Sequence, residues 1–190
     1  MSPSGGKKKG RLIIISAPSG CGKTTIVERL LARNKNLARS VSYTTRSPRP
    51  GEKAGTDYFF VSSRDFEEKL ASKFFLEHAA VFGEFYGTSK TFVLEKIEKG
   101  NDWILAVDVQ GMKQLTQAKG RIPVVSIFIM PPSAEVLESR LRKRSTETEE
   151  EVKKRLTVAK REMAERLLYD HVIVNEEVEE AVQKIEEILK

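Results

Sequence analysis

The feature that most constrains this chain is a glycine-rich segment that follows a short apolar run and precedes a helical pattern. Its residues are Ala17, Pro18, Ser19, Gly20, Cys21, Gly22, Lys23 and Thr24. The order is nearly G-x-x-x-x-G-K-[ST], in which backbone N–H groups wrap a phosphate, the lysine meets its outer oxygens and the hydroxyl holds Mg²⁺. Only Ala17 departs from the pattern, at the first glycine. A positive φ at that position would strain an alanine, whereas an ordinary φ would cost little. We therefore expect a phosphate-binding loop here.

The segments around this loop alternate between strand and helix patterns. Residues 11–16 form an isoleucine-rich apolar run, typical of a strand that is buried on both faces of a parallel sheet. Further strands are expected at 103–108, 124–130 and 171–174. Helices are expected at 23–34, from a cap at Ser133 to about Arg144, from a capping box of Thr146 and Glu149 to about Leu168, and at 178–188. The alternation predicts an α/β fold of the P-loop NTPase type, a parallel sheet flanked by helices.

The stretch from residue 40 to residue 99 interrupts this alternation and is too long to be a loop. It begins with a polar, proline-containing part and continues with a short strand pattern at 58–61, helical patterns at 64–72 and 92–99, and a turn around Phe85 and Tyr86 between Gly83 and Gly87. We interpret it as an inserted mixed α/β lobe. The expected organisation is a flexible tail at 1–10 and a single domain at 11–190, with a core at 11–39, 100–132 and 169–190, the lobe at 40–99, and a helical lid with the following helix at 133–168.

Composition excludes several classes of protein. With 190 residues, 39% of them hydrophobic and 32% charged, the chain suits one globular domain. No apolar run is long enough to cross a bilayer, and no secretory pattern is visible, so we expect no membrane partner. The single cysteine, Cys21, can form no intramolecular disulfide, which favours a packing role and a reducing cytoplasm. The net charge of +6 fits nucleic acids or small anions, and its dispersed arginines favour small anions over nucleic acid.

A second anion site is indicated in the inserted lobe. Between Ser42 and Glu52 lie two arginines, Arg46 and Arg49, flanked by hydroxyl groups and by prolines. Guanidinium groups bind phosphate oxygens through two parallel hydrogen bonds, and Tyr58 and Tyr86 could add neutral donors. The pattern indicates a phosphomonoester site. The alternative is a solvated polar loop.

At this point several motifs together resemble the guanylate kinase family. They are the phosphate-binding loop, Ser42-x-x-Thr45-Arg46-x-x-Arg49-x-Gly51-Glu52, Asp57-Tyr58, Phe75-Leu76-Glu77, Tyr86-Gly87-Thr88, Asp108-Val109-Gln110-Gly111 and Arg144-Ser145-Thr146-Glu147-Thr148. The resemblance runs in order from about Arg11 to the C-terminus. It implies transfer of the γ-phosphoryl group of ATP to GMP, giving ADP and GDP, with Mg²⁺ as cofactor. It also implies that the lobe binds the nucleoside monophosphate and that the lid closes over ATP.

The resemblance assigns roles by position on the acceptor side. Residues implied to hold the GMP phosphate are Arg46, Arg49, Tyr58 and Tyr86, and those implied to recognise guanine are Ser42, Glu77, Thr88 and Asp108. A carboxylate such as Glu77 accepts from N1–H and from the amino group of guanine, a donor pair that adenine lacks. Asp108 could instead support Mg²⁺ through water. Many members carry a second acidic residue two positions earlier, where this chain has Ala106, so we assign no role there.

On the donor side, the resemblance implies that ATP is bound by the loop residues from Ala17 to Thr24, by Thr25, and by Arg140 and Asn175, the last through adenine. Thr24 would hold Mg²⁺. The catalytic groups would be Lys23, Arg49, Arg144 and Arg155, which spread and neutralise the charge on the transferred group. For each lid arginine, the alternative is a solvated helical face.

Three rival interpretations remain at this stage. A related scaffold domain would bind phosphorylated peptides, but such domains usually lack the intact Gly22-Lys23-Thr24 found here. A related kinase would take another acceptor, such as AMP or a ribose bisphosphate. A nucleic-acid-binding NTPase is suggested only by the basic charge. The expected partners are ATP and GMP, with dGMP as an open question, in a monomer or a homodimer.

Overall fold

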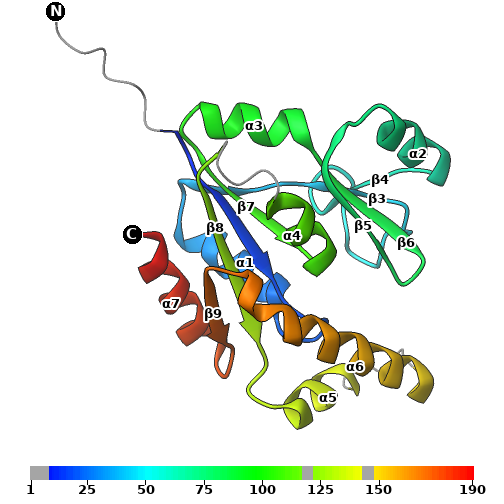
Figure 1. Cartoon of the computed structure of the whole chain (residues 1–190), viewed down its shortest axis with the longest axis vertical. Coiled ribbons are helices and arrows are strands. Elements are labelled where there is room, and N and C mark those ends of the chain that lie inside the picture. Colours follow the sequence, from blue (N-terminus) through cyan, green and yellow to red (C-terminus); the bar gives the residue numbers. More distant parts are fainter. Residues whose placement is uncertain (1–8, 117–121, 143–147) are drawn as a thin grey trace, which may run out of the picture.

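The computed structural model describes residues 9–116, 122–142 and 148–190, and its centre is a sheet of five parallel strands (Figure 1). In sheet order the strands are β2 (Leu37–Arg39), β7 (Asp102–Val107), β1 (Leu12–Ser16), β8 (Val124–Met130) and β9 (His171–Val174). Every neighbouring pair is parallel. The expected parallel sheet is thus confirmed, and its middle strand, β1, leads directly into the glycine-rich loop.

Helices cover both faces of this sheet. On one face lie α1 (Lys23–Arg33), α5 (Ala134–Arg142), α6 (Glu149–Ala164) and α7 (Val178–Leu189), and on the other lie α3 (Lys90–Glu98) and α4 (Val109–Thr116). Strand β1 serves both layers, because Ile13 and Ile15 pack with the first group while Leu12 and Ile14 pack with the second. This double burial explains why the strand is apolar at every position.

The inserted lobe carries its own sheet of four strands, drawn at the upper right of Figure 1. In order these are β4 (Tyr58–Phe60), β3 (Ser42–Thr44), β6 (Glu84–Ser89) and β5 (Phe75–Val81), with α2 (Ser63–Ala71) beside them. Strand β3 is parallel to β4 and antiparallel to β6. The expected turn around Phe85 and Tyr86 is wrong: both residues lie in β6, and the hairpin turns at Phe82 and Gly83. Residues 84–89 form a continuous strand, so Gly87 is a strand residue and does not mark a turn.

The lid helices differ from the expectation at one boundary. Ser133 caps α5 as expected, since its Oγ accepts from the Val136 N–H at 3.3 Å. The predicted capping box of Thr146 and Glu149 is wrong, because Thr148 is the N-cap of α6 and Glu151 is its partner. The carboxylate of Glu149 instead pairs with Arg142. Thr146 lies outside the described residues. Helix α6 continues as a short 3₁₀ turn, η1 (Glu165–Leu168).

The chain is anchored from the first residues that the structure describes. Lys9 pairs with Glu98 at 2.7 Å, and the buried Gly10 donates to the Ile97 carbonyl at 2.9 Å. A Cβ at position 10 would lie 1.9 Å from the Asn101 carbonyl oxygen. Placing Gly10 in a flexible tail is therefore a mistake, since this glycine is part of the fold. Within the described residues, no helix combines the length and apolarity needed to span a membrane.

Candidate active site

The glycine-rich loop joins the end of β1 to the start of α1 and is tightly enclosed. Gly20 and Gly22 have φ values of 92° and 83°, in the left-handed region that favours glycine. A Cβ at Gly20 would lie 3.1 Å from a methyl carbon of Leu137, and one at Gly22 would lie 2.7 Å from the amide nitrogen of Asn175. Ala17 is not among the described residues with positive φ. The one departure from the motif therefore causes no strain.

Lys23 points from the first turn of α1 toward the ends of the central strands. Its Nζ donates to the carbonyl of Val107, at the end of β7, over 3.1 Å. Burial lowers the pKa of Lys23, and the negative charges of Asp108, Glu162 and Glu77 oppose that shift. The lysine thus lies in the field of several carboxylates at the carboxyl edge of the sheet, which is where ligands bind in folds of this kind.

The inserted lobe presents a buried carboxylate with a chain of hydroxyl groups. Glu77 on β5 is only 4% exposed, and its Oε1 accepts from Thr88 Oγ1, on β6, at 2.6 Å. Ser42 Oγ, on β3, lies 3.2 Å from Thr88 Oγ1. Because the Thr88 hydrogen is used toward Glu77, Ser42 is the donor in that second contact. Burial raises the pKa of Glu77 to about 7, and the hydrogen bond from Thr88 partly opposes the rise.

Helix α4 brings Asp108 to the same carboxylate. The Gly111 N–H donates to Asp108 Oδ1 at 2.9 Å, which fixes the aspartate just before α4. A Cβ at Gly111 would lie 2.6 Å from Glu77 Oε2, so the helix can approach the lobe this closely only with glycine there. The charge of Asp108 adds to the rise in the Glu77 pKa. The four residues expected to recognise guanine are therefore gathered from four separate segments.

The two arginines expected to bind the acceptor phosphate lie in the segment between β3 and β4. Glu52 accepts from both terminal nitrogens of Arg46, at 2.9 and 3.0 Å, and from the backbone N–H of Arg49 at 2.7 Å. The Arg46 guanidinium lies 5.4 Å from the centre of the Tyr58 ring, and the Tyr58 and Tyr86 rings are 6.0 Å apart. The structure thus groups Arg46 with both tyrosines. The side chain of Arg49 is exposed.

Two of the lid arginines reach the donor side. Arg155 on α6 donates to Ser19 Oγ in the loop at 3.1 Å. Arg140 on α5 donates to the carbonyl of Asn175 at 3.3 Å, just after β9. Asn175 is 1% exposed and donates from its side-chain amide to the Cys21 carbonyl at 2.8 Å. Arg144 lies outside the described residues.

One residue that faces this region was missed by the sequence interpretation. Burial raises the pKa of Glu162, on α6, to about 7, and the Lys23 charge opposes that rise. Glu162 lies seven positions after Arg155 and three after the buried Ala159, so the three share one helical face. Helical spacing from Arg155, which the sequence had already assigned to the site, could have identified Glu162.

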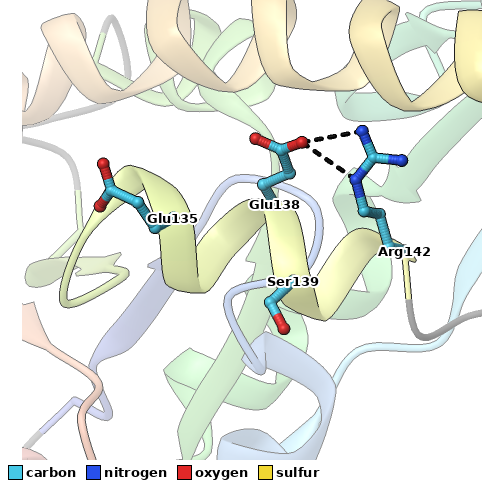
Figure 2. A pocket seen from close by; sticks show the side chains of 4 residues that line it. All are labelled: Glu135, Glu138, Ser139 and Arg142. Atoms are coloured by element: carbon cyan, nitrogen blue, oxygen red, sulfur yellow. Dashed lines mark hydrogen bonds and ion pairs between the residues drawn. The ribbon is translucent and has the colours of Figure 1, made fainter.

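A surface hollow on α5 shares no residue with any of these groups. It is lined by Glu135, Glu138, Ser139 and Arg142 (Figure 2). Glu138 and Arg142 pair across it at 2.8 Å, and Arg142 also pairs with Glu149. The opposite face of α5, through Leu137, packs on the phosphate-binding loop. The helix thus supports the loop from its inner side, and the hollow adds no group to the site.

Comparison with known proteins points in one direction. Residues 9–190 match the model of the family described as guanylate kinase. A guanylate kinase of Wolbachia sp. subsp. Brugia malayi is 45% identical over 183 residues, covering 96% of this chain and 93% of the relative. One of Caldanaerobacter subterraneus subsp. tengcongensis is 46% identical over 184 residues, covering 96% and 88%. The solved guanylate kinase of Anaplasma phagocytophilum is similar with a TM-score of 0.79 at 38% identity, covering 96% and 86%.

Proposed function

We infer that this chain, which belongs to the guanylate kinase family, transfers the γ-phosphoryl group of ATP to GMP and gives ADP and GDP. The observation that carries the inference is the meeting of two unlike groups at one edge of the sheet. Lys23 ends the phosphate-binding loop, and the buried carboxylate of Glu77 is close enough for the lysine charge to lower its pKa. The residue expected to bind the triphosphate donor, Lys23, thus lies near the residue expected to recognise the acceptor base, Glu77.

Guanine is recognised by Glu77 with the help of its neighbours. Thr88 bonds to Oε1, and Oε2 lies on the α4 side of the site, beside Gly111. Guanine offers N1–H and an amino group to such a carboxylate, whereas adenine would leave buried polar groups unpaired. Asp108 and the hydroxyl oxygen of Ser42 supply further acceptors. This arrangement supports GMP over AMP.

The acceptor phosphate is held by Arg46, Arg49, Tyr58 and Tyr86. Glu52 orients Arg46 and also fixes the turn that presents Arg49. A guanidinium held in place by a carboxylate loses little further freedom when it binds a phosphate, which favours a defined position for the attacking oxygen. Arg49, exposed at the turn, is the arginine free to swing toward the transferred group.

The donor side combines the loop N–H groups, Lys23 and the lid arginines. Mg²⁺ fits this site through the hydroxyl of Thr24, which is exposed at the first turn of α1. Over the described ranges there is no group of three or more His, Cys, Asp or Glu able to hold a metal, and a magnesium held by one hydroxyl, waters and phosphates needs none. When bound, the ion neutralises phosphate charge. Arg155, together with Arg144 as the resemblance implies, would neutralise charge on the transferred group, and Arg140 and Asn175 would border ATP. Supporting the ion through water is the alternative role of Asp108 to contacting guanine.

The experiment is a comparison of acceptors. ADP production from ATP and Mg²⁺ is measured with GMP, dGMP, AMP, CMP, UMP or no acceptor, for the native chain and for Lys23→Ala. We expect turnover with GMP, and with dGMP if the ribose 2′-hydroxyl is not needed, and loss of turnover in Lys23→Ala. Preference for AMP would contradict the role of Glu77. Binding of GMP without turnover in the native chain would favour a scaffold domain.

A further inference from the structure

The tip of the β5–β6 hairpin has an unusual residue for its backbone shape. Val81 pairs with Glu84, so Phe82 and Gly83 form a two-residue turn, with φ values of 53° and 87°. Turns with two positive φ values favour Asn or Asp followed by glycine. A bulky aromatic residue in the left-handed region is strained, and such strain persists where the surrounding structure requires it. The turn itself does not favour phenylalanine at position 82, so a role of its side chain has to explain the residue.

The Phe82 ring lies against the lid. It is 44% exposed, and the guanidinium carbon of Arg155 is 4.7 Å from the ring centre, within the range of a cation–π contact. The same guanidinium donates to Ser19 Oγ at 3.1 Å. One side chain on α6 thus touches the tip of the acceptor lobe and the phosphate-binding loop. In Figure 1 the β5–β6 hairpin extends from its lobe toward α6.

We propose that Phe82 is a positioning residue, whose ring orients the Arg155 guanidinium at the phosphate-binding loop while the acceptor lobe is closed on the core. The proposal rests on the proposed function, because it concerns how the lid arginine is placed for phosphoryl transfer. The hairpin that carries Phe82 also carries Glu77 and Tyr86. Because a cation–π contact is short-ranged, movement of this hairpin away from α6 ends the contact between Phe82 and Arg155. Placement of the acceptor is in this way coupled to placement of a charge-neutralising group on the donor.

Substitutions of Phe82 separate the ring from the turn. Phe82→Leu keeps an apolar side chain in the strained turn but removes the aromatic face, and we expect kcat to fall about three- to tenfold with the KM for ATP and GMP unchanged. Phe82→Tyr keeps the face and should keep kcat. Phe82→Asn suits the turn, so kcat should fall as in Phe82→Leu while Tm stays the same or rises. A structural role alone would lower Tm and kcat together.

Phe92 on α3 gives a matched control. It is 42% exposed and has the Lys96 ammonium 5.2 Å from its ring centre, so Phe92→Leu removes a similar exposed cation–π contact away from the site. We expect its kcat to match that of the native chain. In an Arg155→Ala background, Phe82→Leu should have no further effect on kcat, because the two residues act through one contact.

A readout that does not use activity keeps this proposal separate from the proposed function. The rate at which an arginine-specific reagent modifies Arg155 is followed by mass spectrometry, and it should be higher in Phe82→Leu than in the native chain and unchanged in Phe92→Leu. Equal kcat and equal modification in Phe82→Leu and the native chain would overturn the proposal. So would a full effect of Phe82→Leu in the Arg155→Ala background. If the native chain does not phosphorylate GMP at all, the proposed function fails, whatever the modification rates.

Discussion

The two nucleotide sites of this chain are built in different ways. The donor loop is one contiguous segment, and its shape comes from the backbone, through positive φ at Gly20 and Gly22 between a buried strand and a helix. The proposed acceptor site consists of side chains that the fold assembles, with Ser42, Glu77 and Thr88 from three strands of the lobe sheet. The proposed donor site is thus local in the sequence, whereas the proposed base site is tertiary and depends on individual side chains.

The largest expected effect lies on the donor side. Lys23→Ala should lower kcat by about 10³-fold. The substitution removes a positive charge, held in a partly buried site, that stabilises the negative charge developing on the transferred phosphoryl group. The Kd for GMP in the absence of ATP, measured by calorimetry, should be unchanged if the acceptor site does not depend on the donor loop. The measurement belongs at about pH 8.5, because the Lys23 charge lowers the pKa of Glu77 and its removal would raise that pKa. The exposed Lys35→Ala is the control, and a large loss of GMP affinity in Lys23→Ala would break the comparison.

On the acceptor side, Glu77→Gln should lower kcat/KM for GMP by about 10²-fold, since an amide N–H then faces a donor of guanine in a buried site. The affinity for ATP, whose loop is made of backbone groups, should not change. Steady-state kinetics with each substrate varied in turn checks both statements. Glu67→Gln, an exposed change on α2, is the matched control. An equal loss for ATP would mean that the two sites are not separable.

The donor half could be largely predicted from the sequence because its signals are local. A continuous apolar run predicted β1, the motif predicted the loop, and helical spacing predicted α1, all within adjacent residues. The strands β7, β8 and β9 were found for the same reason, since each is a compact apolar run, although β9, at the edge of the sheet, buries only Ile173. In this half, the residue that was missed is Glu162, which reaches Lys23 only through the packing of α6.

The acceptor half was less predictable because its strands are short and polar. Strand β3 has only 3 residues, within a stretch dominated by hydroxyls and prolines. At the hairpin tip, Phe82 occupies a position where asparagine is the usual turn signal, so the glycines at 83 and 87 suggested a different turn. The capping box was displaced because both Thr146–Glu149 and Thr148–Glu151 fit the same spacing. The pairing of Glu77 with Thr88 and Asp108 had to come from the family resemblance.

A smaller effect is expected from the residue that supports the phosphate arginines. Glu52→Gln should raise the KM for GMP by about 20-fold with less change in kcat, because Arg46 loses a charge-assisted bidentate partner and the turn at Arg49 loses an acceptor. Arg46 also lowers the pKa of Glu52 by hydrogen bonding, so the carboxylate is charged throughout the working range. Glu68→Gln, which breaks an exposed pair with Arg64 on α2, is the control. An unchanged KM would mean that Arg46 needs no support to bind the phosphate.

The smallest expected effect is a dependence of GMP binding on pH. Glu77 has a pKa of about 7 in the folded chain, and only its ionised form accepts both guanine donors. The Kd for GMP should therefore rise about fourfold between about pH 8.5 and about pH 6.5, measured by calorimetry without ATP. For folding the sign is opposite. Because the folded pKa exceeds the usual value of 4.5, the unfolded chain loses its proton first, and this residue's contribution to the free energy of unfolding falls as pH rises from about 4.5 to about 7.

Two groups with a pKa of about 7 allow this effect to be assigned to one half of the molecule. Glu162 titrates in the same range and, like Glu77, interacts with Lys23, but it lies on α6 and not in the lobe. Glu162→Gln should leave the pH dependence of GMP binding as it is, whereas Glu77→Gln should remove it. If Glu162→Gln flattened the profile instead, the titrating group would be Glu162, and the coupling between Lys23 and Glu77 would extend to this carboxylate on α6. In that case the separation between a backbone-built donor site and a side-chain-built acceptor site would hold for contacts but not for electrostatics.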